Sequence, residues 1–71
     1  MESDILRQFG GQVRKLRIER NISQYTLGAI CDLDRNYIGM IERGQRNPSL
    51  KSIEKIAIGL KVSIIDIFKN L

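Results

Sequence analysis

Histidine is absent from the 71-residue sequence, and cysteine occurs once, as Cys31. Without histidine the chain lacks the usual general base near neutral pH and the commonest metal ligand, and a single cysteine excludes a thiolate zinc cluster and an internal disulfide. A glycine-rich phosphate-binding loop is missing too, because Gly10 and Gly11 form a bare pair inside a helical pattern. These absences argue against an enzyme, and we expect no metal and no cofactor.

Long apolar runs are missing as well. No segment approaches the roughly 20 residues of a membrane span. The N-terminal stretch MESDILRQFG carries acids, where a secretion signal has basic and then apolar residues. We therefore expect a cytoplasmic protein with no membrane partner. The length predicts one domain, residues 1–71, with a small core, since a chain of this size buries only about 60% of the surface of its unfolded form.

Basic residues outnumber acidic ones, twelve to eight, which gives a formal net charge of +4. This balance suits a polyanionic partner but is common among small domains. The distribution of charge is more informative. The segment from Arg35 to Lys51 holds four basic residues and one acid, Glu42.

Apolar periodicity predicts an all-α chain of five helices. From Ile5 to Arg20 the apolar residues recur at intervals of three and four, which builds one stripe along an amphipathic helix. Ser3 or Asp4 can cap its start, and Asn21 is suited to the left-handed conformation that ends it. At the glycine pair we expect either a close packing contact or fraying.

Four further helices are shorter. Ser23 caps a second helix of about eight residues, and Asp34 caps a third, Arg35 to about Arg43, which Gly44 ends. Pro48-Ser49 opens the fourth. The fifth runs from Ile64 to about Asn70, with Ser63 and Asp66 as a capping-box-like pair. The residues of the fourth helix expected to face inward are Leu50, Ile53, Ile56, Ala57 and Leu60.

The stretch from Gln24 to Arg43, QYTLGAICDLDRNYIGMIER, has the pattern of two short helices that cross at a tight turn. Gly28 stands where the first helix must let the second approach closely. Cys31 falls on an inward position, where we expect a small buried hydrophobe rather than a reactive thiol. The stretch therefore predicts a helix-turn-helix, a DNA-reading unit. Its inward residues are Leu27, Cys31, Leu33, Ile38 and Ile41.

Arg35, Asn36 and Tyr37 form the first turn of the third helix, the part that enters the major groove when a helix-turn-helix binds DNA. Arginine can bond O6 and N7 of guanine, asparagine can pair with adenine, and tyrosine can reach a phosphate or a thymine methyl. The alternative is a solvated helix start in which Asp34 serves only as a cap.

Further polar residues are placed to bind the DNA backbone. Exposed amides at a helix start, together with the helix dipole, favour a phosphate group. For each of these side chains the alternative is an ordinary solvated surface position. The predicted backbone contacts are Gln24 at the start of the second helix and Arg43, Arg46, Asn47, Ser49 and Ser52 around the start of the fourth.

Two other features predict structure. Arg17 and Glu42 each adjoin an inward residue, so we expect a partly buried ion pair that ties the first helix to the third, with a DNA contact by Arg17 as the alternative. The last helix carries apolar residues on more than one face, which favours a twofold homodimer over a frayed C-terminus. The predicted interface residues are Ile64, Ile65, Ile67, Phe68 and Leu71.

From Arg14 to Phe68 the sequence resembles the helix-turn-helix domain of the phage repressor and Cro type. The stretches that carry the resemblance are RKLRIERNISQYTLG, YIGMIERGQRNPSLKSIEKIA and GLKVS. The resemblance implies a five-helix repressor-like DNA-binding domain in which the second and third helices read DNA. It also implies that Arg17 pairs with Glu42, that Gln24 lies at the DNA backbone, and that the fifth helix helps to form a dimer.

Within that family, DRNYIGMIERGQRNPS is similar to the controller proteins of restriction-modification systems, small dimers that bind paired operators and regulate their own operon. This match implies base contacts by Arg35 and Asn36 and places Tyr37 at the phosphate boundary. Two residues depart from the family pattern: Asp32 replaces a turn glycine, which Asp tolerates, and Asn36 replaces Thr or Ser, which affects the operator sequence. The match further implies phosphate contacts by Arg46, Asn47 and Ser52.

These observations together predict a dimeric transcriptional regulator that binds an inverted repeat in a double-stranded DNA operator. RNA polymerase is a candidate further partner. Two alternatives remain open: a prophage repressor or antitoxin-type autorepressor, which shares the chemistry, and a protein-interaction module on the same fold. Salt dependence separates the last from a DNA reader, because phosphate contacts weaken steeply with ionic strength.

Overall fold

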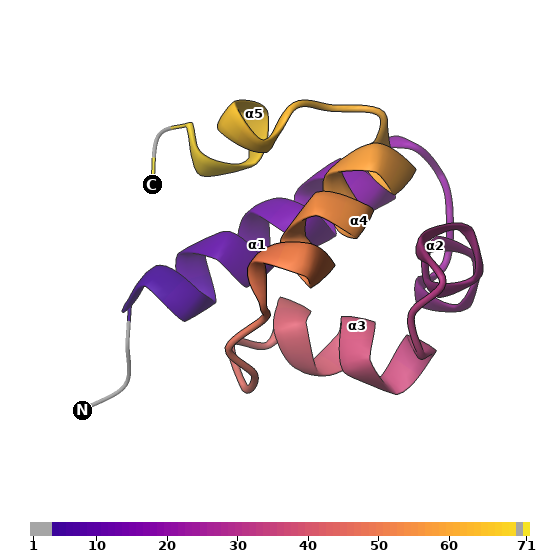
Figure 1. Cartoon of the computed structure of the whole chain (residues 1–71), viewed down its shortest axis with the longest axis horizontal. Coiled ribbons are helices and arrows are strands. Elements are labelled where there is room, and N and C mark those ends of the chain that lie inside the picture. Colours follow the sequence, from indigo (N-terminus) through magenta and orange to yellow (C-terminus); the bar gives the residue numbers. More distant parts are fainter. Residues whose placement is uncertain (1–3, 70) are drawn as a thin grey trace.

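The computed structural model of the chain describes residues 4–69 and 71, and within this part every regular element is a helix. The all-α, five-helix prediction is confirmed (Figure 1). The helices are α1 (Asp4–Glu19), α2 (Gln24–Cys31), α3 (Arg35–Glu42), α4 (Leu50–Leu60) and α5 (Ile64–Phe68).

Side-chain caps set the start of each short helix. The side chains of Ser23, Asp34 and Ser49 accept hydrogen bonds from backbone N–H groups in the first turns of α2, α3 and α4. Ser63 and Asp66 form the predicted capping box at the start of α5. Local sequence signals therefore suffice to place these four starts.

The helix ends also follow the sequence, with small differences. Asn21 and Gly44 have positive φ angles, 55° and 73°, as predicted for residues that stop a helix. Helix α3 ends one residue earlier than expected, at Glu42, and α5 ends at Phe68. The proposed cap Ser3 and the proposed end Asn70 lie outside the described residues.

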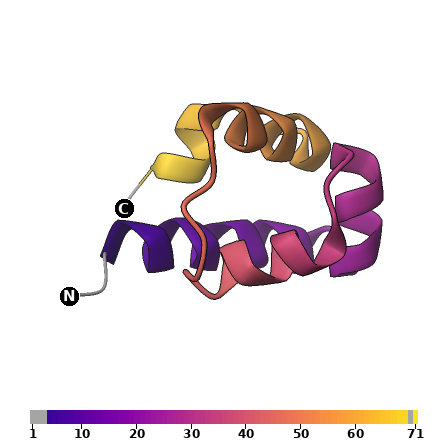
Figure 2. The ribbon, with the colours of Figure 1, turned by 60° about the horizontal axis from the view of Figure 1, so that its bottom comes forward.

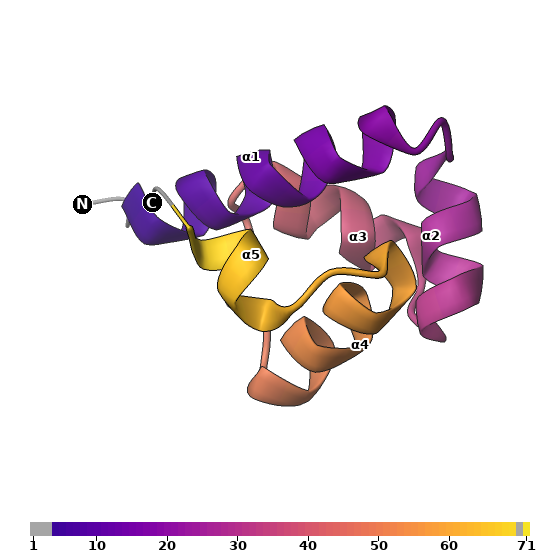
Figure 3. The same cartoon turned by 90° about the horizontal axis from the view of Figure 1, so that it is seen from above.

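The helices pack in two layers around one core. Figure 2 shows α1 and α3 in one layer, α4 and α5 in the other, and α2 across one end. In Figure 3, α5 lies between α1 and α4, and both contact it. The apolar stripes of all five helices meet between the layers, at Phe9, Val13, Leu27, Cys31, Ile38, Ile41, Ile53, Ile56, Ala57, Leu60 and Ile67. Burial raises the pKa of the Cys31 thiol, in keeping with a core residue.

Leu50 corrects the predicted inward face of α4. It is 83% exposed at the first position of α4, so the buried face of this helix begins only with Ser52 and Ile53. Ile53, Ile56, Ala57 and Leu60 are buried as expected.

The expected close contact at the glycine pair is found at Gly10. A Cβ atom there would lie 2.8 Å from the backbone oxygen of Glu42, so α1 and the end of α3 approach each other too closely for a larger residue. A Cβ atom on Gly11 would meet open space. Among the described residues, no helix is both long enough and apolar enough to cross a membrane.

Candidate nucleic-acid interface

The turn between α2 and α3 brings the two helices together without a glycine at its left-handed position. Asp32 has a φ of 58°, and the amide of Leu33 donates to the oxygen of Gly28 at 2.8 Å. Gly28 is buried, and a Cβ atom on it would lie 2.5 Å from the oxygen of Leu33. The prediction that Gly28 permits the close approach is therefore confirmed, and aspartate accepts the conformation that usually requires glycine.

The first turn of α3 presents two exposed polar side chains to solvent. The Asp34 carboxylate accepts a hydrogen bond from the amide of Asn36 at 2.7 Å, so it is occupied as a cap. Arg35 and Asn36 are both exposed. A base edge in a groove could therefore reach their guanidinium and amide groups.

Tyr37 is only half-buried and connects α3 to the start of α4. Its hydroxyl donates to Oγ of Ser52 at 3.1 Å. The Ser52 side chain also receives a hydrogen bond from the Ser49 hydroxyl, at 3.2 Å. Ser52 is buried, and its oxygen accepts both hydrogen bonds, which leaves its own O–H group as a donor. Ser52 thus holds the Tyr37 hydroxyl in place, and its predicted phosphate contact stays a prediction.

The loop after α3 carries two exposed polar residues, Arg46 and Asn47, of which Arg46 contacts α3. The Arg46 guanidinium lies 5.3 Å from the centroid of the Tyr37 ring, within the range of a cation–π contact. Exposed Arg43 donates from Nε to Oε1 of Gln45 at 3.0 Å. Arg35 and Asn36 belong to α3, Arg43 directly follows its last residue, and Arg46 contacts Tyr37 of the same helix, while their predicted DNA contacts stay predictions.

Arg17 and Glu42 form the predicted ion pair. Arg17 Nε lies 2.7 Å from Glu42 Oε2 and its second terminal nitrogen donates to Oε1 at 3.0 Å, while the Glu42 side chain is only 1% exposed. The hydrogen bond to Glu42 raises the pKa of the Arg17 guanidinium, against the lowering effect of burial. Arg17 is thereby occupied within the protein, which favours the structural role over a DNA contact.

Gln24 belongs to the same cluster. Its amide nitrogen donates to Glu42 Oε1 at 3.0 Å, so one carboxylate connects α1, α2 and α3. The amide oxygen of Gln24 lies against Gly39 in the middle of α3. The hydrogen bond to Glu42 fixes the direction of the Gln24 side chain, and its predicted contact with the DNA backbone stays a prediction.

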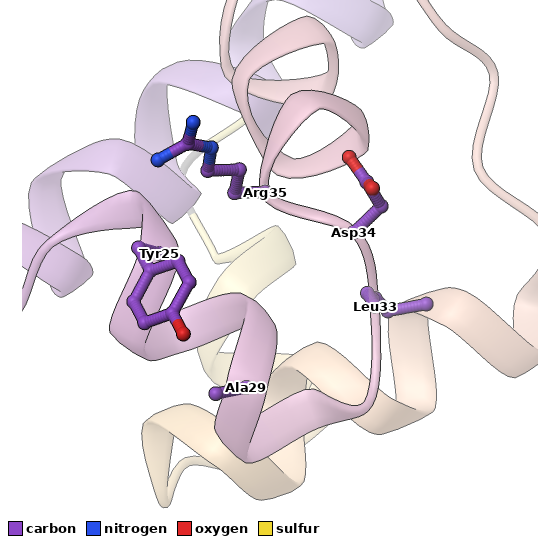
Figure 4. A pocket seen from close by; sticks show the side chains of 5 residues that line it. All are labelled: Tyr25, Ala29, Leu33, Asp34 and Arg35. Atoms are coloured by element: carbon purple, nitrogen blue, oxygen red, sulfur yellow. The ribbon is translucent and has the colours of Figure 1, made fainter.

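Tyr25 is a residue of this surface that the sequence reasoning missed. The guanidinium carbon of Arg35 lies 5.9 Å from the centroid of the Tyr25 ring. Figure 4 shows both side chains at an open hollow between α2 and α3 that Ala29, Leu33 and Asp34 also line. An exposed aromatic residue immediately after Gln24 was the available signal.

The predicted dimer surface divides into two parts. Ile64, Ile65, Phe68 and Leu71 keep exposed apolar area, with Ile65 the most open at 74%. Ile67 is fully buried in the protomer core, so its prediction as an interface residue is wrong. Ile67 lies on the apolar face of α5 that packs against α1 and α4 and completes the core. Phe68 also stacks on Phe9, with ring centroids 5.2 Å apart.

Comparison with known proteins gives matches along nearly the whole chain. Residues 13–67 match the helix-turn-helix family. Control protein C.MunI of a Mycoplasma species is 41% identical over 70 residues, which cover 97% of this chain and 95% of C.MunI. The structure of the restriction-modification controller protein C.AhdI from Aeromonas hydrophila is 42% identical, covers 93% of this chain and 100% of that chain, and gives a TM-score of 0.91.

A third match is the restriction-modification controller protein C.Esp1396I, solved as a tetramer in complex with its natural 35-base-pair operator. It is 40% identical, covers 96% of this chain and 90% of that chain, and gives a TM-score of 0.89. The turn, the pairing of α2 with α3 and the sequence identity all indicate the same family. This chain therefore belongs to the helix-turn-helix family, and it is similar in sequence and fold to the controller proteins of restriction-modification systems.

Proposed function

We propose that this chain is a restriction-modification controller protein, a dimeric regulator of transcription that binds an inverted-repeat operator in double-stranded DNA. The observation that carries the proposal is the first turn of α3, where Arg35 and Asn36 stand exposed beside the cations of the following loop. The protein would act in the cytoplasm, on the operator of its own operon, and without catalysis or a cofactor. RNA polymerase is the protein partner that such a regulator would influence.

Base recognition would come from Arg35 and Asn36. The planar guanidinium matches O6 and N7 of a guanine, and the amide matches N6 and N7 of an adenine. Both side chains start from the N-terminal end of α3, the end that a helix-turn-helix inserts into the major groove. Specificity would therefore depend on these two positions.

Backbone binding would come from the residues around them. Arg43, Arg46 and Asn47 are exposed and could reach phosphates along one strand. Ser49 lies exposed at the start of α4, where the helix dipole favours an anion, although its hydroxyl already caps the helix. Tyr37 and Ser52 support this group through the contact with Arg46 and the hydrogen bond to α4. Gln24, at the start of α2, would also bind the DNA backbone.

Dimerisation would place two copies of α3 in successive major grooves. The exposed apolar residues at the C-terminus, Ile64, Ile65, Phe68 and Leu71, are the surface that a second copy could cover. In a twofold dimer the same surface of each copy covers that of the other, so neither copy leaves it exposed. The two half-sites would lie about one helical turn, roughly 34 Å, apart.

The operator complex of C.Esp1396I suggests a larger assembly on DNA. That structure holds a tetramer on 35 base pairs, a length of about 120 Å at roughly 3.4 Å per base pair. This length accommodates four half-sites, so we propose that two dimers of the present chain bind adjacent sites. Occupancy would then rise steeply with protein concentration.

Selection of bound duplexes from random DNA tests the proposed function. We expect enrichment of an inverted repeat with half-sites one helical turn apart, and a binding constant that falls steeply as salt is raised. The control is the double variant Arg35→Ala/Asn36→Ala, which should enrich no common sequence while keeping weak, salt-sensitive binding. Failure of the unaltered protein to enrich any sequence would refute the proposal.

A further inference from the structure

Tyr25 and Arg35 come from different helices and meet at the DNA-facing side of the helix-turn-helix. Tyr25 is the second residue of α2 and is 65% exposed, and Arg35 is the first residue of α3. The Arg35 guanidinium lies over the Tyr25 ring, 5.9 Å from its centroid, beside the open hollow of about 540 Å³ between the helices (Figure 4). We infer that Tyr25 is a positioning residue that holds Arg35 ready to read a base, an inference that rests on the proposed function.

An arginine side chain loses rotational freedom when it binds a guanine. A cation over the face of a tyrosine ring is attracted by the negative potential of that face, which restricts the side chain before binding. The contact joins the guanidinium carbon to the ring face, which leaves the N–H groups at the guanidinium edge available for O6 and N7 of guanine. Restriction in a competent orientation lowers the entropy cost of the contact and strengthens binding.

The surroundings of Arg35 support the ring as its partner. The neighbouring carboxylate of Asp34 accepts the amide of Asn36 and caps α3. Among the described residues, neither an ion pair nor a side-chain hydrogen bond involves Arg35. The cation–π contact with Tyr25 is therefore the side-chain contact that the structure shows for the Arg35 guanidinium. A wide-open hollow beside it leaves room for a base edge.

The free protein gives a test that needs no DNA. An aromatic ring shifts the resonances of protons held above its face, so the Arg35 side-chain protons should be shifted upfield in the NMR spectrum. We expect this shift to persist in Tyr25→Phe and to vanish in Tyr25→Ala. Ile30→Ala is the matched control, because Ile30 is an exposed apolar residue of the same helix that borders a different hollow. Random-coil shifts of Arg35 in the unaltered protein would overturn the inference.

Binding to the selected operator duplex tests the function of the contact between Tyr25 and Arg35. Tyr25→Ala should weaken binding about two- to fivefold, the range expected of an exposed cation–π contact. It should also reduce the preference for guanine at the position read by Arg35. Tyr25→Phe, which keeps the ring, and Ile30→Ala should bind like the unaltered protein. Thermal unfolding of each variant shows whether it is folded.

A double-mutant cycle separates positioning from other roles. In an Arg35→Ala background, Tyr25→Ala should cause no further loss, because there is no guanidinium left to position. An equal loss in both backgrounds would mean that Tyr25 contacts DNA by itself and would overturn the inference, as would tighter binding by Tyr25→Ala. If Arg35→Ala itself leaves base preference unchanged, the reading of bases in the proposed function fails instead.

Discussion

Arg35 and Arg46 lie in different parts of the proposed DNA interface, and their substitution should have different effects. Arg35→Ala should cost about 1 to 3 kcal/mol of binding free energy and relax the preference at one base position per half-site, since it removes a base contact. Arg46→Ala should weaken binding to all sequences similarly and lower the salt slope by about one unit per lost phosphate contact. Competition titrations with single-base operator variants at two salt concentrations measure both. If Arg46→Ala reorders the variants while Arg35→Ala does not, the two roles are reversed.

The Arg17 to Glu42 ion pair is the residue contact on which stability should depend most. Arg17→Met removes one partner and leaves the Glu42 carboxylate buried, with the Gln24 amide as its remaining donor. We expect a loss of about 3 to 5 kcal/mol in the free energy of unfolding, measured by urea denaturation. Arg14→Met is the matched control on an exposed position of the same helix. A loss no larger than that of the control would show that the pair does not stabilise the fold.

Contacts between side chains could be predicted only where the helical pattern dictates them. Arg17 and Glu42 both adjoin inward residues, so any helix crossing that buries those residues brings the charges together. Tyr25 and Arg35 meet through the angle between α2 and α3 and through their rotamers, which no sequence period encodes. The burial of Ser52 likewise depends on Tyr37 reaching across from α3.

At the scale of helices, the starts of α2 to α5 were predictable because each of these four helices has its own side-chain cap. The errors lie where neighbouring elements decide burial. Leu50 continues the apolar stripe of α4 but is exposed, and Ile67 was assigned to a partner although the protomer core buries it. A periodic pattern identifies an apolar face, whereas the packing of the whole chain decides what covers each end of that face.

The capping box of α5 should give this helix a measurable acid sensitivity. Hydrogen bonds from Ser63, backbone first and side chain second, lower the pKa of Asp66 below its ordinary 3.8. Because the pKa of Asp66 is lower in the folded state, the capping box stabilises the fold at pH values above the ordinary pKa. This stabilisation is lost as the pH falls through the folded-state pKa. NMR titration of the Ser63 amide should give a midpoint below 3.8, and Asp66→Asn should abolish the titration. A midpoint at or above that value would contradict the assignment.

For the whole molecule, the central expectation is a dimer formed through exposed residues of α5. Ile65→Asp should shift the protein towards the monomer in sedimentation experiments, because it places a charge on the most exposed apolar side chain of that helix. Ile65 is a better probe than Phe68, whose contact with Phe9 also supports the protomer. Ile30→Asp, on α2, should leave the association unchanged. A dimeric Ile65→Asp protein would show that the interface lies elsewhere.

The shared carboxylate of Glu42 has a consequence for how this protein would bind half-sites that differ in sequence. Arg17, Gln24 and Glu42 join α1, α2 and α3, and Gly10 brings the backbones of α1 and α3 into close contact. The angle of the recognition helix is therefore fixed by interactions that would all have to break for it to change. When half-sites differ in sequence, the adjustment must come from the DNA, through bending and groove width. Operators would then be ranked by the elastic cost of deforming them, including at base pairs that the protein never touches.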